Sequence, residues 1–511
     1  MKINLLELFE DTIYKHGEKK AVIDGNESIS FKELDLKSDL LAYEINQLTN
    51  SQRKPVAVLL SKSIDAVVTD IAIMKSGNFF MNLDNKTPIQ RLNNIVRLIE
   101  PAVIITNSSN LHLAEAIVDS NNIIVIDKLC TDSYVDKEKV RNLWTHLIDT
   151  DPFCIINTSG STGTPKGVAL SHLGFLDFIY RSQESFNFTE DEIIGSLSPI
   201  VFDIYVLELC MLMYRASTIV LLPAHLSAFP VKILKILQEQ RVSFIFWVPT
   251  IMVNIANMGL LEKEPLPDLR LVWFAGEVFP TAQFNVWRNA LPHTQFANLY
   301  GPIETSVDSL FYKIEREIPD NEPIPIGYAY KNTDILLLDD ENNRVTAPGK
   351  EGEICVRGSS LALGYYNNPE KTAAAFVQNP LNPHYPERIY RTGDVAIIND
   401  RGEVVFRGRK DSLIKHQGYR IELGEVEHVI VNTLHLVKNG CVVYNFNSKE
   451  IILFYENQDE LDIAQFRKAL LSQLPRYMTP SKIVRETELK RNTNGKIDRL
   501  FYKNKINSSE G

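Results

Sequence analysis

A loop of eleven residues, from Asn157 to Gly167, carries the residue types that could bind a phosphate chain. Its three glycines and five hydroxyl side chains leave many backbone amides unshielded, so the amides can donate hydrogen bonds to phosphate oxygens. Lys166 adds a mobile positive charge, and Pro165 stiffens the turn just before it. We therefore expect a polyphosphate cradle here, while a flexible hairpin turn is the alternative for such a composition.

The loop differs from the common phosphate-binding motif, in which a glycine-rich loop ends in Gly-Lys-Ser/Thr and leads into a helix. Lys166 is instead followed by Gly167 and by an apolar run, Val168 to Leu170, that predicts a strand. Another predicted strand, Phe153 to Ile156, comes just before the loop. The loop thus indicates a nucleotide without specifying the family that binds it.

Predicted strands and helices alternate on both sides of this loop. Before it, strands from Val56 to Leu60 and from Phe79 to Leu83 flank a helix from Ala66 to Lys75. After it, a helix from Leu173 to Phe186 and a strand from Phe244 to Val248 continue the alternation. This pattern predicts an α/β fold in which wound, mostly parallel sheets carry helices on their faces.

The chain changes character twice towards its C-terminus. From about Ile324, short strands separated by turn residues predict a small β-rich subdomain. The segment from Gly408 to Gly418 is charged and bracketed by glycines, which predicts a domain boundary. We expect an N-terminal domain of residues 1–410 and a small α+β domain of residues 411–511. Within the small domain the sequence predicts helices from Leu423 to Val431 and from Ile463 to Leu474.

Composition limits the classes of function. The formal net charge of −10, without a basic stripe, argues against a nucleic-acid partner. No apolar run approaches the roughly 18 residues that span a bilayer, so we expect no membrane partner either. The N-terminus has acidic residues and no signal-peptide pattern, and the five cysteines are scattered without a C-x-x-C pair. A cytoplasmic protein with buried thiols is the simplest account.

Four short stretches follow the loop along the chain: Gly276-Glu277, Asn298 to Glu304, Tyr390 to Asp394, and Asn494 to Asp498. Together and in this order they resemble the acyl- and aminoacyl-adenylate-forming superfamily, above all the adenylation domains of nonribosomal peptide synthetases and their free-standing relatives. The resemblance covers nearly the whole chain. It implies a ligase that converts ATP and a carboxylic acid into acyl-AMP and pyrophosphate. A phosphopantetheine thiol then takes the acyl group as a thioester.

The resemblance implies catalytic roles for four residues. Lys496 would bridge the substrate carboxylate and the α-phosphate, and Thr158 and Lys166 would hold the phosphate chain. Glu304 would bind Mg²⁺, since this hard cation prefers carboxylate oxygen. An ordinary surface lysine is the alternative for Lys496, although the preceding Asn-Gly predicts a tight turn that would direct it into a cleft.

The resemblance also implies an ATP-binding set drawn from the loop and the later motifs. Tyr300 would stack on adenine, Asn298 would bond the adenine edge, and Asp394 would accept both ribose hydroxyls. The full set is Thr158, Ser159, Gly160, Ser161, Thr162, Gly163, Lys166, Gly276, Glu277, Asn298, Tyr300, Gly301, Asp394, Arg409 and Lys496.

Relatives of this kind change the orientation of their C-terminal domain between the two half-reactions, at the residue that matches Asp411. We therefore expect residues 411–511 to act as a mobile lid with its hinge at Asp411. Two positions depart from the family pattern. Ile303 stands where Thr is usual, and Asn82 stands where Pro is common before Leu-Asp.

Asp203 aligns with the aspartate that pairs with the α-ammonium of an amino acid substrate. A carboxylate among apolar residues needs a cationic partner to offset its desolvation, and an ordinary helix N-cap is the alternative. By the same alignment, the pocket is formed by Asp203, Ile204, Leu207, Phe246, Trp273, Ala275, Leu299, Val307 and Asp308. This lining resembles that of free-standing prolyl-loading enzymes, except that Asp308 is charged and Trp273 is large.

The leading interpretation is therefore an ATP- and Mg²⁺-dependent ligase that loads L-proline, or a similar small or modified amino acid, onto a separate carrier protein. The chain ends about fifteen residues after Lys496, without an obvious carrier motif. A D-alanine–carrier protein ligase and an acyl- or aryl-CoA synthetase are alternatives, and Asp203 disfavours the latter. A catalytically weak nucleotide-binding relative is the non-enzyme alternative, favoured only by Ile303.

Overall fold

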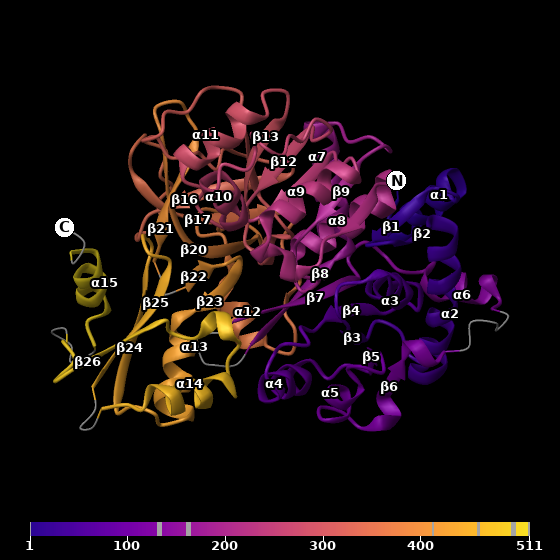
Figure 1. Ribbon diagram of the computed structural model, residues 1–511, viewed down its shortest axis with the longest axis horizontal. Helices are drawn as coiled ribbons and strands as arrows, with labels where there is room; N and C mark the ends of the chain where they lie inside the picture. The colour runs from indigo at the N-terminus through magenta and orange to yellow at the C-terminus, as the bar shows by residue number, and fades with distance from the viewer. Residues whose placement is uncertain are drawn as a thin grey trace. The chain divides into compact units, whose positions relative to one another are not determined.

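The computed structural model describes residues 2–129, 135–159, 165–410, 413–456, 460–491 and 497–508. The chain divides into two compact units. The larger unit comprises Met1–Asn85, Ile99–Ile156 and Val168–Gly408, and the smaller unit comprises Lys86–Leu98, Asn157–Gly167 and Arg409–Gly511. Figure 1 labels their helices and strands.

The larger unit contains a nine-stranded sheet with the strand order β15-β14-β13-β12-β11-β9-β10-β1-β2. Its strands are β1 (Lys20–Asp24), β2 (Glu27–Ser30), β9 (Ile193–Ser196), β10 (Thr218–Leu221), β11 (Phe244–Trp247), β12 (Leu271–Phe274), β13 (Gln295–Tyr300), β14 (Leu310–Lys313) and β15 (Tyr328–Ala329). The strands from β13 to β1 run parallel, and β2, β14 and β15 pair antiparallel. Parallel strands are buried on both faces, which explains their continuous apolar sequences.

A second sheet has seven strands in the order β18-β8-β7-β4-β3-β5-β6. They are β3 (Pro55–Leu59), β4 (Phe79–Asn82), β5 (Val103–Thr106), β6 (Ile123–Val125), β7 (Pro152–Thr158), β8 (Lys166–Ser171) and β18 (Gly364–Tyr365). The phosphate-loop candidate therefore connects two neighbouring strands, as the flanking apolar runs predict.

Helices cover both faces of the nine-stranded sheet. The α-helices along residues 5–375 are α1 (Leu5–His16), α2 (Phe31–Thr49), α3 (Ile64–Lys75), α4 (Ile89–Ile99), α5 (Leu111–Glu115), α6 (Lys137–Trp144), α7 (His172–Phe186), α8 (Asp203–Arg215), α9 (Pro230–Glu239), α10 (Pro249–Asn257), α11 (Thr281–Ala290) and α12 (Pro369–Ala375), and most of α4 belongs to the smaller unit. Helices α9, α10 and α11 pack on one face (Figure 1). Helices α7 and α8 pack on the other and share a core with α3 and the seven-stranded sheet.

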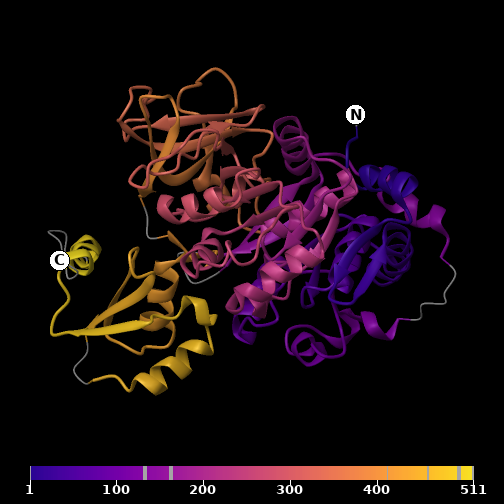
Figure 2. The same cartoon turned by 45° about the horizontal axis from the view of Figure 1, so that its top comes forward.

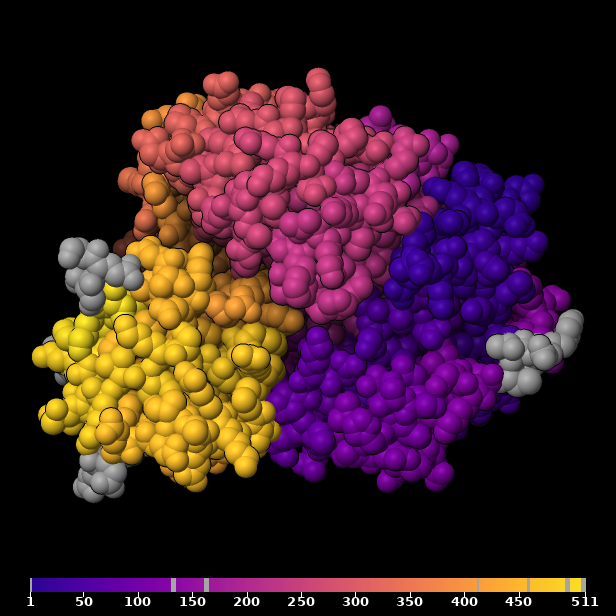
Figure 3. All heavy atoms as spheres, viewed as in Figure 1, coloured from indigo at the N-terminus to yellow at the C-terminus, as the bar shows by residue number. Residues whose placement is uncertain are grey.

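Helix α8 is buried from Ile204 to Met213, because it lies between the two sheets. Helix α1 packs along it, and the Thr12 hydroxyl donates a 2.7 Å hydrogen bond to the Met213 carbonyl. Figure 3 shows the indigo N-terminal residues and the magenta residues meeting in one continuous surface. The position of α8 is thus set by the core around it.

A five-stranded antiparallel sheet forms the β-rich part of the larger unit. Its strands are β16 (Thr333–Leu338), β17 (Glu351–Gly358), β19 (Phe376–Gln378), β20 (Arg388–Ile398) and β21 (Val404–Arg409). Their order is β16-β17-β20-β19, and β21 also pairs with β20. Short strands separated by polar turns predicted this sheet from the sequence.

The smaller unit is an α+β structure. It contains β22 (Leu413–His416), β23 (Tyr419–Glu422), β24 (Asn439–Asn445), β25 (Glu450–Glu456), β26 (Lys482–Glu486), α13 (Leu423–His428), α14 (Ile463–Leu471) and α15 (Arg499–Ser508). Strands β24, β25 and β26 form one sheet, with α13 and α14 packed on one face and α15 on the other (Figure 2).

The α/β fold class predicted from the sequence is confirmed, while two helices are shorter than expected. The helix expected from Leu423 to Val431 ends at His428 and continues as a wider π-type turn from Val429 to Thr433. This turn begins with three β-branched residues, which lose side-chain freedom in an α-helix. The helix expected from Ile463 to Leu474 ends at Leu471. None of the helices in the described ranges is long and apolar enough to cross a membrane.

Candidate functional site

The apolar residues expected to line a substrate pocket gather in one core of the larger unit. Phe246 pairs with Trp273 across β11 and β12, so both side chains point to the same face of the nine-stranded sheet. Helix α8 contributes its first turns to the same core. The members of this core from the predicted pocket are Ile204, Leu207, Phe246, Trp273, Ala275, Leu299 and Val307.

Asp203 is the first residue of α8 and is partly buried. One of its carboxylate oxygens, Oδ1, accepts a 2.9 Å hydrogen bond from the backbone amide of Ile204. The N-cap position belongs to Phe202, which makes no side-chain capping bond, so Asp203 is not the N-cap residue. A carboxylate in the first turn is stabilised by the positive end of the helix dipole, which favours its charged form.

Trp273 is enclosed by aromatic rings. The ring centroids of Phe178, Phe186, Phe188, Phe244 and Phe246 lie between 4.7 and 6.4 Å from it. Its side chain is 1% exposed, and its indole N–H is buried without a hydrogen-bond partner among the described residues. The Trp273 indole therefore fills the apolar core beside Phe246. A substrate pocket there is shallower than it would be with a smaller residue at position 273.

The turn that holds Val307 and Asp308 has an unusual backbone. Ser306 and Val307 have φ values of 54° and 75°, in the left-handed region that a β-branched residue rarely adopts. Gly301 allows this turn, because a Cβ at that position would lie 2.4 Å from the Asp308 Cα. Burial raises the pKa of the Tyr330 phenol well above its usual value, and the negative charge of Asp308 adds to the shift. A neutral phenol thus lies near this carboxylate.

Two predicted nucleotide-binding residues contact each other directly. The Tyr300 hydroxyl, at the end of β13, donates a hydrogen bond to the Asp394 carboxylate in β20. Asn298 uses its side-chain amide to donate a 2.8 Å hydrogen bond to the Pro325 carbonyl. Gly276 follows β12 with a φ of 92°, a conformation that favours glycine. The fold therefore brings Tyr300 and Asp394, from distant motifs, into direct contact.

Glu304 is completely buried, and its carboxylate accepts a 2.8 Å hydrogen bond from the Tyr365 hydroxyl. Glu277 accepts a 3.1 Å hydrogen bond from the Thr250 amide and another from the Thr250 hydroxyl. The side chain of Ile303 is buried in the main core. The Glu304 carboxylate is therefore held by the Tyr365 hydroxyl and the Glu277 carboxylate by the Thr250 hydroxyl, and neither Tyr365 nor Thr250 belongs to the predicted set.

No local sequence pattern predicted a role for Tyr365 or Thr250. Tyr365 follows Glu304 by 61 residues and reaches it because β18 pairs with β8. Thr250 precedes Glu277 by 27 residues and lies in the first turn of α10. For Thr250 the sequence cue was its position just after the predicted strand from Phe244 to Val248.

The structure describes Asn157, Thr158 and Ser159 at the start of the phosphate-loop candidate. The Ser159 hydroxyl donates a 2.8 Å hydrogen bond to the Arg420 carbonyl and accepts a 3.0 Å bond from the Glu422 amide. Ser159 stays a predicted phosphate contact, and its hydroxyl anchors the start of the loop to β23. The Thr158 hydroxyl is buried and makes no hydrogen bond within the described ranges. A buried hydroxyl in this state suits a bound ligand.

The other predicted residues of the smaller unit lie at strand ends or outside the described ranges. Lys166 begins β8, and Arg409 ends β21. The residues outside the described ranges are Gly160, Ser161, Thr162, Gly163, Asp411 and Lys496.

A family model for the AMP-binding enzyme matches residues 9–366, which contain the phosphate-loop candidate, the pocket residues and Glu304. The chain belongs to this family. Zwittermicin A synthase ZmaJ of Bacillus cereus is 30% identical over 506 residues, covering 98% of this chain and 94% of that protein. The chain therefore matches this relative over nearly the whole length of both proteins.

Tyrocidine synthase 1 of Brevibacillus parabrevis is also 30% identical, over 495 residues, but this AMP-binding chain spans only 44% of its length. Among solved structures, holo-PA1221 is described as an NRPS protein containing adenylation and PCP domains. It superposes with a TM-score of 0.84 at 22% identity, covering 98% of this chain and 84% of that one. At this identity the likeness shows a shared fold.

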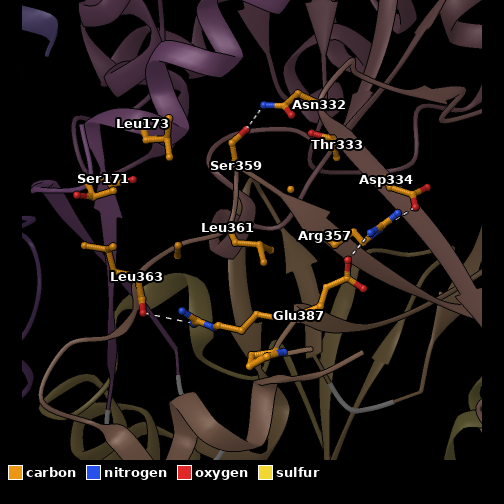
Figure 4. Close-up of a pocket in the computed structure, with 15 residues that line it drawn as sticks. Ser171, Leu173, Asn332, Thr333, Asp334, Arg357, Ser359, Leu361, Leu363 and Glu387 are labelled. Atoms are coloured by element: carbon orange, nitrogen blue, oxygen red, sulfur yellow. Dashed lines mark hydrogen bonds and ion pairs between the residues drawn. The ribbon is translucent and has the colours of Figure 1, made fainter. Parts of the chain in front are cut away.

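A cavity of about 720 Å³ lies elsewhere in the larger unit of this AMP-binding enzyme (Figure 4). Arg357 crosses its wall between Asp334, at 2.9 Å, and Glu387. Its described lining contains none of the predicted site residues and consists of Thr150, Ser171, Leu173, Asn332, Thr333, Asp334, Arg357, Gly358, Ser359, Leu361, Ala362, Leu363, Pro386, Glu387 and Arg388. The Arg357 guanidinium is paired with two carboxylates, so it is not available to bind an anion in this cavity.

Proposed function

We propose that this AMP-binding enzyme activates an amino acid as aminoacyl-AMP and passes the aminoacyl group to the phosphopantetheine thiol of a carrier protein. The observation that carries the proposal is Asp203 at the start of α8, next to Ile204 and Leu207 of the apolar core. A carboxylate at the edge of an apolar pocket would pair with the substrate ammonium, which offsets the desolvation of both charges.

The proposed substrate is L-proline or a similar small amino acid. Trp273 and Phe246 fill the core beneath the lining with aromatic rings, which favours a compact aliphatic or cyclic side chain. A long polar side chain would have to lose its water without a matching partner there. Asp308 and the neutral Tyr330 phenol add polar groups that would suit a hydroxyl or amine of a modified amino acid.

ATP would be held by the predicted nucleotide-binding set. Tyr300 would stack on adenine with its hydroxyl bonded to Asp394, which fixes the plane of the ring beside the carboxylate proposed to bind the ribose. The unbonded Thr158 hydroxyl and the Lys166 ammonium would hold the phosphates.

Glu304 is the proposed Mg²⁺ ligand, and Mg²⁺ would neutralise charge on the phosphates. The described residues contain no cluster of three or more metal-ligating side chains. One carboxylate together with substrate phosphates is the usual way in which enzymes bind this ion, so Glu304 fits it. Tyr365 would orient the carboxylate through its 2.8 Å hydrogen bond.

A carrier protein is the proposed acceptor of the aminoacyl group, as a separate chain. The likeness to holo-PA1221, which contains adenylation and PCP domains, supports a carrier of this class. A cytoplasmic location, expected from the composition, is part of the same proposal.

Amino-acid-dependent exchange of pyrophosphate into ATP, measured over the proteinogenic amino acids, D-alanine, hydroxyproline, aryl acids and fatty acids, would test the function. We expect the highest rate with L-proline or a close analogue. A higher rate with aryl or fatty acids than with every amino acid would contradict the proposal.

A further inference from the structure

A buried polar cluster lies behind the first turn of α8. It consists of Asp70 in α3, Asn82 at the end of β4, and Tyr205 in α8, which are exposed by 0%, 5% and 0%. One carboxylate oxygen of Asp70, Oδ2, accepts a 2.8 Å hydrogen bond from the Tyr205 hydroxyl and a 3.2 Å bond from the Asn82 amide. Burying polar side chains in an apolar core costs free energy, so the presence of this cluster needs an explanation.

Asn82 links this cluster to the backbone that precedes Asp203. Its Nδ2 atom also donates a 3.1 Å hydrogen bond to the Ile200 carbonyl. A side-chain amide nitrogen has two hydrogens, so the bond to Asp70 leaves the second hydrogen directed at Ile200. Asp70 therefore orients the amide that holds residue 200. A proline at position 82, common in the wider family, would supply neither bond.

Lys62 anchors the same segment from its other end. Its ammonium donates hydrogen bonds of 2.8 Å to the Ser196 carbonyl and 3.2 Å to the Ser198 carbonyl. Burial lowers the pKa of Lys62 to about 8, and the negative charge of nearby Glu208 in α8 acts in the opposite direction. The backbone from Ser196 to Ile200 is thus held by two polar side chains from outside it.

Along the chain, Asp203 lies between Ile200, which Asn82 holds, and Tyr205, which Asp70 holds. Ile200 comes three residues before it, and Tyr205 comes two residues after it. The Asn82 bond fixes the approach of the chain to α8, and the Tyr205 bond fixes the first helical turn against α3. A shift of either attachment would move the carboxylate relative to the pocket.

The geometry points to Asp70, Asn82 and Tyr205 as positioning residues that set the place of the Asp203 carboxylate for the substrate ammonium. This inference rests on the proposed function and extends it from the pocket to the residues behind it. An ion pair weakens steeply when its geometry is displaced, so a loosened Asp203 would lower amino acid affinity and leave ATP affinity unchanged.

Asn82→Ala and Tyr205→Phe would test the inference in the full-length chain, with KM values for the amino acid and for ATP from pyrophosphate exchange. We expect each variant to raise the amino acid KM by about fivefold to tenfold, the equivalent of one to two hydrogen bonds, with ATP KM within about twofold. Tyr205→Phe removes a single oxygen atom, so it keeps the test usable if Asn82→Ala does not fold.

Thr69→Val is the matched control. Thr69 precedes Asp70 in α3, is fully buried, and donates a 2.7 Å hydrogen bond to the Asp65 carbonyl, away from residues 196–205. This variant should lower the Tm without a selective change in the amino acid KM. The double variant Asp70→Leu/Asn82→Ala should raise that KM by about the same factor as Asn82→Ala/Tyr205→Phe, because Asp70 acts through both Asn82 and Tyr205.

The inference is overturned if the Asn82 and Tyr205 variants change the amino acid KM no more than Thr69→Val does, or if they raise the ATP KM equally. A wild-type chain without amino-acid-dependent exchange would instead contradict the proposed function. The two failures are therefore distinguishable.

Discussion

The Tyr300 hydroxyl donates a hydrogen bond to the Asp394 carboxylate and so ties the end of β13 to β20. These residues belong to two sequence motifs that are 94 residues apart. Both are largely buried, at 9% and 6% exposure, so the bond is shielded from water. The proposed adenine and ribose contacts are thereby coupled to each other.

Tyr300→Phe should raise the ATP KM by about fivefold to tenfold in pyrophosphate exchange, because the ring keeps its stacking face but loses its fixed orientation. The amino acid KM should change little. Tyr312→Phe is a matched control, since the Tyr312 hydroxyl donates a 2.7 Å hydrogen bond to Glu403, another carboxylate. Equal effects of the two substitutions on the ATP KM would count against the nucleotide role of Tyr300.

Asp203→Ala should raise the amino acid KM by at least about a hundredfold or abolish exchange, since the substrate ammonium would lose its charged partner in a poorly solvated pocket. ATP affinity, measured by direct binding, should stay nearly intact. Asp203→Asn keeps the size of the side chain and should show a similar loss, which separates charge from packing. A parallel loss of ATP binding would argue for a general disruption of α8.

Asp411→Pro should keep much of the adenylation rate and slow transfer to a carrier-protein thiol, because proline fixes φ near −65° at the proposed hinge. Lys496→Ala should stop adenylation and still allow transfer from preformed aminoacyl-AMP. Single-turnover assays of each half-reaction would measure both effects. If both substitutions slowed both steps by similar factors, the hinge proposal would fail.

His172 provides a prediction about stability. It is buried at the start of α7, where its Nδ1 accepts a 3.5 Å hydrogen bond from the Leu5 amide, and burial lowers its pKa to about 4. Between about pH 6.5 and pH 4 the unfolded chain binds a proton at this residue that the folded chain does not, so this contribution destabilises the fold as pH falls. From pH 7 to pH 5 the loss is about 2 kcal/mol.

His172→Gln should remove this part of the pH dependence, measured as the unfolding free energy in urea at pH 7 and pH 5. The comparison must be made with the wild type, because other groups titrate in the same range. Burial raises the pKa of Asp70 and of Glu208 to about 7, so these groups stabilise the fold as pH falls. An identical pH dependence of the two proteins would exclude His172 as a contributor.

The sequence predicted the fold class and the core-facing residues well, because strand and helix periodicities reflect local burial. Alignment with the family assigned Phe246 and Trp273 to one predicted pocket, and the strands that carry them pair with these two residues opposite each other. The bond between Ser159 and β23, and the partnership of Glu304 with Tyr365, depend on chain reversals between distant segments. Such contacts leave no periodic signal in the sequence.

Asn82 illustrates the same limit. Asn82 departs from the family pattern, and the sequence alone does not show what its side chain does. The fold places Asn82 beside Asp70 and the Ile200 carbonyl, and its side-chain amide donates a hydrogen bond to each of them. A polar residue at the end of a buried strand is a weak cue, because many such residues simply reach solvent.

The most direct test compares the best amino acid substrate with the same molecule lacking its amino group, for example L-proline with cyclopentanecarboxylate. Both have a carboxylate that could attack ATP, and they differ in the ammonium proposed to pair with Asp203. Pyrophosphate exchange at equal concentrations should be at least about a hundredfold faster with the amino acid. Equal rates for the two acids would contradict the assignment of this chain as an amino-acid-activating enzyme.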